Sequence, residues 1–167
     1  MIELSTKRLK LIPLNAKYLD LLINDEQSLE IELSVSSKEV FLDEELRQAL
    51  KFRLSKVLEN EENYIWYTNW LIVSKEENCI VGGIMLKGLP NEHGEVIIGY
   101  YIFPPYQGKG YMTETVRAMK DWLLRQSNVK YVVADTDKDN IASHKVLQKA
   151  GATLYSESEE LYYWRFI

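Results

Sequence analysis

The stretch of this chain best suited to chemistry is residues 106–114, which read Tyr-Gln-Gly-Lys-Gly-Tyr-Met-Thr-Glu. It follows an apolar, strand-like run at residues 96–103 and begins the clearest helical pattern in the sequence. Gly108 and Gly110 allow the backbone to turn sharply and to approach a ligand closely. The first N–H groups of the helix have no partner within the helix and lie at the positive end of its dipole. This stretch therefore predicts a binding site for a phosphate-bearing ligand.

Two common nucleotide-binding loops do not fit this stretch. The P-loop places a glycine five positions before its Gly-Lys pair and a Ser or Thr after it. Here Phe103 and Gly110 occupy those positions. The dinucleotide-binding loop requires a small residue where this chain has Thr113, and an acidic residue about twenty positions further on. The sequence there is Val-Lys-Tyr at 129–131, so the predicted phosphate site belongs to neither class.

Size and composition predict one domain, residues 1–167, that is large enough to bury a hydrophobic core. The net charge of −5 argues against nonspecific binding to nucleic acid or to an anionic membrane, and it suits a cationic substrate such as an amine. A single cysteine, Cys79, excludes an internal disulfide and fits a reducing cytoplasm. No apolar stretch approaches the ~20 residues of a membrane span, and we expect a cytoplasmic protein.

The elements around the loop follow from hydrophobic periodicity. Residues 8–13 alternate and predict a strand that Pro13 ends, and Asn15 can cap a helix that runs through residue 24. The spacing predicts a second helix at 44–59 and leaves the course of 25–43 open. Three β-rich runs, at 66–74, 80–87 and 95–103, are separated by short turns and predict an antiparallel meander.

The second half predicts a crossover between two parallel strands. Helix 110–125 would connect strand 95–103 to a buried strand at 129–135. A further helix at 140–150 is capped by Asp139-Asn140 and ends at Gly151, and a hairpin of strands 152–156 and 161–167 follows. The residues expected to point inward are Met112, Val116, Met119 and Leu123 on the first helix, and Ala142, Val146, Leu147 and Ala150 on the second.

This order of elements carries motifs that resemble the GNAT superfamily of acetyl-CoA-dependent N-acetyltransferases. The motifs are the 107–110 loop and the run Asn140-x-x-Ser143-x-x-Val146-Leu147-x-Lys149-x-Gly151. Residues 6–13 and 98–101 are most similar to the branch that contains the RimJ/RimL-like ribosomal-protein N-terminal acetyltransferases. The resemblance covers essentially the whole chain. It implies the acyl-CoA N-acyltransferase fold, an α/β domain with a mixed, mostly antiparallel twisted sheet of about six or seven strands and about four helices.

The same resemblance implies acetyl-CoA as the acyl donor. Backbone groups of Tyr101, Ile102 and Phe103 would pair with the pantetheine amides. The diphosphate would lie on the N–H groups of residues 107–112, namely Gln107, Gly108, Lys109, Gly110, Tyr111 and Met112. Met112 stands where the family usually has Gly or Ala, so its side chain must point away from the diphosphate. Asn140 would hydrogen-bond the cofactor arm, although a simple helix cap also explains an asparagine there.

Three residues are candidates for the chemistry. Many members of the superfamily use a tyrosine acid where this chain has Leu147, so Ser143 becomes the nearest candidate to protonate the CoA thiolate, with a packing role as the alternative. Glu95 is a candidate base, or else a solvated residue at the start of its strand. Tyr100 is either a core aromatic or part of a pocket wall. No metal is expected, because His93 and His144 lack other ligands at suitable spacing.

The sequence therefore predicts transfer of acetyl from acetyl-CoA to a primary amine by direct attack. The acceptor would be a protein N-terminus or a small-molecule amine. The alternative is a non-catalytic acyl-CoA-binding sensor or regulatory module of the same fold. In either case we expect no nucleic-acid or membrane partner, and either a monomer or a homodimer.

Overall fold

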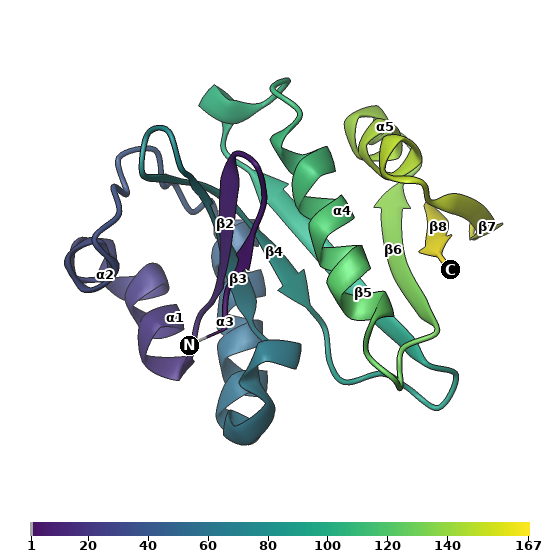
Figure 1. Cartoon of the computed structure of the whole chain (residues 1–167), viewed down its shortest axis with the longest axis horizontal. Helices are drawn as coiled ribbons and strands as arrows, with labels where there is room; N and C mark the ends of the chain where they lie inside the picture. The colour runs from purple at the N-terminus through teal and green to yellow at the C-terminus, as the bar shows by residue number, and fades with distance from the viewer. Residues whose placement is uncertain (1) are drawn as a thin grey trace.

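The computed structural model describes residues 2–167, which form one eight-stranded sheet with helices on both faces (Figure 1). The strands are β1 (Leu4–Ser5), β2 (Leu9–Pro13), β3 (Asn69–Ser74), β4 (Cys79–Leu86), β5 (Glu95–Ile102), β6 (Tyr131–Asp137), β7 (Thr153–Glu157) and β8 (Leu161–Phe166). The helices are α1 (Ala16–Asn24), α2 (Glu26–Leu33), α3 (Glu44–Glu59), α4 (Tyr111–Leu124) and α5 (Ile141–Ala150), with 3-10 helices η1 (Glu61–Trp66) and η2 (Pro104–Tyr106).

The order of strands in the sheet is β1-β2-β3-β4-β5-β6-β8-β7. All neighbouring strands are antiparallel except β5 and β6, which α4 connects in parallel. This confirms the predicted mixed, mostly antiparallel sheet and its crossover. The sheet has more strands, and the domain has more helices, than the sequence predicted.

Two of the additional elements have weak sequence signals. Strand β1 contains only two residues. Helix α2 has its apolar side chains at 29, 31 and 33, which is the spacing of a strand, and only Leu29 is buried. A local hydrogen bond starts this helix instead, because the carboxylate of Asp25 accepts from the N–H of Ser28. Local capping, rather than an amphipathic stripe, forms α2.

Other expectations were wrong in detail. The strand expected at 66–74 begins only at Asn69, since residues 61–66 form η1. On α5, Ala142 is exposed, whereas His144 is buried and its Nε2 lies 3.0 Å from the carbonyl oxygen of Asp137. The ring of His144 packs against the rings of Tyr162 and Trp164 on β8, so His144 joins Leu147 and Ala150 on the buried face of the helix in place of Ala142.

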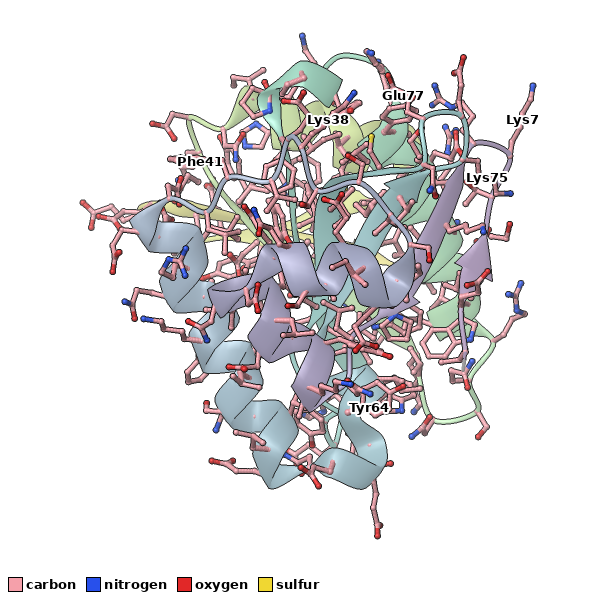
Figure 2. The ribbon with its side chains drawn as sticks, turned by 90° about the vertical axis from the view of Figure 1, so that its left-hand side faces the viewer. Lys7, Lys38, Phe41, Tyr64, Lys75 and Glu77 are labelled. Atoms are coloured by element: carbon pink, nitrogen blue, oxygen red, sulfur yellow. The ribbon has the colours of Figure 1, made fainter. Side chains whose placement is uncertain are left out.

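The two faces of the sheet are covered by different helices. Helix α4 lies across one face with its predicted stripe of Met112, Val116, Met119 and Leu123 buried (Figure 1). Its Trp122 ring lies 5.4 Å from the ring of Trp70 on β3. Helix α3 lies on the opposite face, and α1 packs against α2 and α3. Figure 2 shows the molecule from the left-hand side of Figure 1, with α1 and α2 in the foreground. No helix within residues 2–167 is long and apolar enough to cross a membrane.

Helix α3 offers a matched test of this packing. Leu50 is fully buried, whereas Leu58 on the same helix is 55% exposed. We expect Leu50→Ala to lower the free energy of unfolding by about 2–5 kcal/mol, because it removes buried atoms and leaves a cavity. Leu58→Ala should change it by less than about 0.5 kcal/mol. Urea denaturation measures both, and equal losses would contradict the orientation of α3.

Candidate functional site

Strands β5 and β6 pair over only three residues and then separate. Their register pairs Glu95 with Tyr131, Val96 with Val132, and Ile97 with Val133, and no pair follows. Both strands continue beyond this point, β5 to Ile102 and β6 to Asp137. Residues 98–102 of β5 and 134–137 of β6 are called the fork below. The fork leaves one long edge of β5 without a strand partner, in the middle of an otherwise continuous sheet.

Alternation along β5 decides which main-chain groups face the fork. The carbonyl of Ile97 accepts from Lys87 at one end of the strand, and the N–H of Phe103 donates to Val81 just past the other end. Odd-numbered residues therefore bond to β4, and even-numbered residues point away from it. The main-chain groups of Tyr100 and Ile102 consequently face the fork.

The sequence had assigned the pantetheine to the backbone of Tyr101, Ile102 and Phe103. Tyr101 is an odd-numbered residue and pairs with Gly83 on β4. Both main-chain groups of Phe103 have protein partners, because its carbonyl also accepts from the N–H of Tyr106 at 3.0 Å. Of the three, Ile102 keeps its N–H directed to the fork.

The phosphate loop follows directly from the open end of β5. Gly108 and Gly110 have φ angles of +76° and +79°, the left-handed conformation that favours glycine. Gly110 is the N-cap of α4 and supplies no side chain to the cap. Within residues 2–167, no acceptor lies within hydrogen-bonding distance of the N–H groups of residues 108–113. Met112 is buried in the core, so its side chain points away from these donors.

A cluster of charged hydrogen bonds holds the start of α4 against the β1–β2 hairpin. Glu114 Oε2 accepts from Thr6 Oγ1 at 2.5 Å and from the N–H of Arg8 at 3.0 Å, and its Oε1 accepts from Arg8 Nε at 2.8 Å. The Arg8 guanidinium also donates from Nη1 to the carbonyl of Lys109 and lies 4.5 Å from the ring centre of Tyr111. These contacts join residues more than a hundred positions apart and hold the loop and the start of α4 against the hairpin. No local sequence pattern links Thr6 or Arg8 to Glu114, so this role was not predicted.

Next to this cluster the surface has an open hollow of about 440 Å³, lined by Thr6, Arg8, Gly110, Thr113, Glu114, Arg117 and Lys149. Arg117 Nη2 donates to the carbonyl of Lys149 at 2.6 Å, which ties α4 to α5. The hollow is lined by three cationic side chains, those of Arg8, Arg117 and Lys149, and by one carboxylate, that of Glu114. The hollow therefore suits a phosphate group next to the free N–H groups of the loop.

Tyr100 and Ser143 are brought together on the α5 side of the fork. The Tyr100 hydroxyl donates to the carbonyl of Ser143 at 3.5 Å, which is a long and weak hydrogen bond. Burial raises the pKa of Tyr100 to about 12, so its hydroxyl stays protonated at neutral pH and remains a donor.

The remaining predicted site residues make other contacts. Glu95 is at the paired end of β5, four residues from Gly99, and its carboxylate is 3.4 Å from Asn91 Nδ2. The structure does not bring it together with Tyr100 and Ser143. Asn140 caps α5, because its Oδ1 accepts from the N–H of Ser143 at 3.3 Å. Lys109 Nζ lies 5.4 Å from the ring centre of Tyr106. Residues 2–167 contain no group of three or more His, Cys, Asp or Glu side chains that could hold a metal ion.

A family model described as "Acetyltransferase (GNAT) domain" matches residues 8–153, most of the chain. The chain belongs to the GNAT acetyltransferase family. It is therefore an N-acetyltransferase, which favours the enzymatic prediction over the sensor.

Individual proteins similar to this chain are also N-acetyltransferases by name. The chain is 27% identical to the uncharacterized N-acetyltransferase YjdG of Bacillus subtilis (strain 168), over all of this chain and 99% of the relative. Its fold is similar to that of RimL, the ribosomal L7/L12 alpha-N-protein acetyltransferase, in complex with coenzyme A. The TM-score is 0.70 at 17% identity over 99% of this chain and 98% of the other. It is also similar to the ribosomal-protein-S5-alanine acetyltransferase of Vibrio fischeri, with a TM-score of 0.72 at 18% identity, over 100% and 97% of the two chains.

The Glu114 cluster makes a testable contribution to stability that depends on pH. Burial alone would raise the pKa of the Glu114 carboxyl, but hydrogen bonds from Thr6 and Arg8, and the charge of Arg8, together lower it below its ordinary value. A lowered folded-state pKa stabilises the fold above the unfolded pKa, and this stability is lost as pH falls through the folded pKa. We expect Glu114→Gln to cost about 1 kcal/mol at pH 7. The cost should shrink as pH falls below the ordinary glutamate pKa of about 4.3, and it should vanish once the Glu114 carboxyl of the folded protein is protonated.

Urea denaturation of wild type and Glu114→Gln between pH 3 and pH 7 measures this difference. Asp121→Asn on the same helix is the control, since the Asp121 side chain is largely exposed and pairs only with its neighbour Lys120. A pH-independent loss for Glu114→Gln, or an equal loss for Asp121→Asn, would contradict the role of the cluster.

Proposed function

We propose that this chain transfers acetyl from acetyl-CoA to a primary amine, by direct attack of the amine on the thioester. One observation carries the proposal: an unpaired edge of β5 leads directly into a loop whose N–H groups have no protein acceptor. An extended amide-containing arm and a diphosphate require these two features in this order. Membership of the GNAT family supports the same donor.

Each part of the donor has a candidate partner. The main-chain groups of Tyr100 and Ile102 would pair with the pantetheine amides, as a neighbouring strand would. The N–H groups of residues 108–113 would hold the diphosphate at the positive end of α4. Lys109, Arg117 and Lys149 would supply charge to the phosphates. The Nδ2 of Asn140 has no hydrogen-bond partner within residues 2–167 and remains available to the arm while Oδ1 caps α5.

With this donor, the acetyl group would lie at the closed end of the fork, because of the direction of β5. The phosphate loop begins where β5 ends, so an arm that pairs with β5 runs back from Ile102 toward Ile98. It cannot continue past Ile97, where β6 occupies the edge. The thioester would therefore lie near residues 98–100, close to the hydroxyl of Tyr100.

Catalysis would depend on the positioning of the amine and the thioester, and on one hydrogen-bond donor to the departing sulfur. Holding amine and thioester together removes much of the entropic barrier. The Tyr100 hydroxyl would donate to the departing sulfur; it need not give up its proton, because a thiol has a pKa near ~8.5 and its thiolate leaves readily. Ser143 is the second candidate for this donor. The attacking amine would lose its proton to water, because Glu95 lies away from the pair.

The acceptor would be a protein N-terminus or a small-molecule amine, and the net charge of −5 favours a cation in either case. We expect the protein to act in the cytoplasm, without a nucleic-acid or membrane partner, as a monomer or a homodimer.

Replacing the glycine at the start of α4 tests the donor site. Proline fixes φ near about −65° and cannot adopt the +79° of Gly110. We expect Gly110→Pro to weaken acetyl-CoA binding by at least about tenfold, because the N–H groups would no longer converge. Isothermal titration calorimetry measures the change. Gly151→Pro, at the other left-handed glycine next to a helix, should lower stability but keep the affinity. Unchanged affinity in Gly110→Pro would contradict the placement of the diphosphate.

The hydroxyl of Tyr100 can be tested separately from binding. We expect Tyr100→Phe to lower kcat by about 10²-fold, because it removes a donor aimed at the developing charge. The Kd of acetyl-CoA should not change, since the main chain supplies the binding contacts. Release of CoA thiol with a panel of peptide and small-molecule amines measures kcat. If Ser143→Ala lowers kcat and Tyr100→Phe does not, the donor is Ser143 instead.

A further inference from the structure

Lys87 lies at the point where the two strands separate. It follows β4, and its N–H donates to the carbonyl of Ile97, the last residue of β5 that is paired with β6. Cross-strand partners place their side chains on the same face of a sheet. The side chains of Lys87 and Ile97 therefore share a face with position 99.

The end of the Lys87 side chain packs on Gly99. A methyl group at Gly99 would lie 3.1 Å from Cε of Lys87 and 3.4 Å from its Nζ. The absence of a side chain at Gly99 thus makes room for the amine directly over the backbone of the fork. Within residues 2–167, Lys87 Nζ has no ion pair and no hydrogen bond, and the residue is exposed to solvent.

This face of β5 is the one opposite α4 and α5. The even-numbered residues face those helices, as the bond from Tyr100 to Ser143 shows. The odd-numbered side is open next to the fork, where Ile97 is 39% exposed. An amine on this side and a donor hydroxyl on the other would therefore lie on opposite sides of a thioester held at residues 98–100.

We infer that Lys87 is itself an acetyl acceptor, modified by the acetyl-CoA bound to its own chain. The inference rests on the proposed function, because it requires the thioester in the fork. In the step, the neutral Nζ attacks the thioester carbonyl carbon, a C–N bond forms and the C–S bond breaks. The sulfur leaves as CoA thiolate and takes up a proton, while the nitrogen loses one to water. The products are Nε-acetyl-lysine at position 87 and free CoA.

The placement predicts site selectivity. Lysine acetylation by acetyl-CoA in solution is slow and follows exposure, so all exposed lysines should react at comparable rates without the fork. Proximity should make Lys87 react at least about tenfold faster than Lys10, an exposed lysine on β2. Because the reaction is intramolecular, its rate constant should not depend on protein concentration.

The experiment is incubation of the wild-type protein with acetyl-CoA, followed by peptide mass spectrometry at a series of times and protein concentrations. Excess CoA should suppress acetylation of Lys87 and leave that of Lys10 unchanged. Gly99→Ala, whose methyl group displaces the Lys87 tip, should slow modification of Lys87. Equal rates at Lys87 and Lys10, a rate constant proportional to protein concentration, or no competition by CoA would each overturn the inference.

A second readout does not depend on turnover. CoA, which carries no acetyl group, should protect Lys87 but not Lys10 from an amine-reactive reagent, because its thiol end would lie against the amine. Calorimetry on the same samples separates the two claims. If acetyl-CoA binds and Lys87 is neither protected nor acetylated selectively, this inference fails alone; if acetyl-CoA does not bind, the proposed function fails.

Discussion

The site depends on the early end of pairing between β5 and β6. A strand in the middle of a sheet normally satisfies its main-chain groups on both edges, and unpaired groups away from water are costly. Here pairing ends after Ile97 and Val133, although both strands continue. The even-numbered residues of β5 then present donors and acceptors with strand geometry and no strand to receive them. A ligand with amide groups can take the place of the missing strand.

The remaining elements hold this arrangement in place. Helix α4 buries its apolar stripe on one face of the sheet and thereby fixes where its N-terminus lies. The hydrogen bonds of Glu114 with Thr6 and Arg8 tie that N-terminus to the first hairpin, so its position does not depend on a bound ligand. On β4, Gly82 and Gly83 allow β5 to pack closely. A Cβ at Gly82 would lie 2.3 Å from the carbonyl oxygen of Tyr101, so a residue with a side chain there would push β5 away from β4. Packing against β4 and the anchored start of α4 thus hold β5 and the loop in position.

Local signals were sufficient to predict much of the fold. The helices with an amphipathic stripe, α1, α3, α4 and α5, were predicted within about two residues of their ends. The sharp turn at Gly108 and Gly110 was also predicted, and both glycines adopt the left-handed conformation between β5 and α4. Helix α2 was missed, since its apolar residues alternate as in a strand. The two-residue β1 is too short to have a pattern.

The details of the site depend on contacts that a linear pattern does not contain. Which main-chain groups of β5 face the fork follows from its register with β4. The sequence predicted Tyr101, Ile102 and Phe103, whereas the register favours Tyr100 and Ile102. The partners Arg8 and Glu114 are separated by 106 positions. The contact of Lys87 with Gly99 joins two strands across a turn, and neither residue carries a signal of its own.

Amide hydrogen exchange with and without CoA tests the central claim most directly. The fork and loop predict that CoA slows exchange at the N–H groups of Tyr100, Ile102 and residues 108–113. The N–H groups of Tyr101 and Phe103, which point toward β4, should show little added protection. Protection of the odd-numbered residues instead, or no change at the loop, would contradict the account.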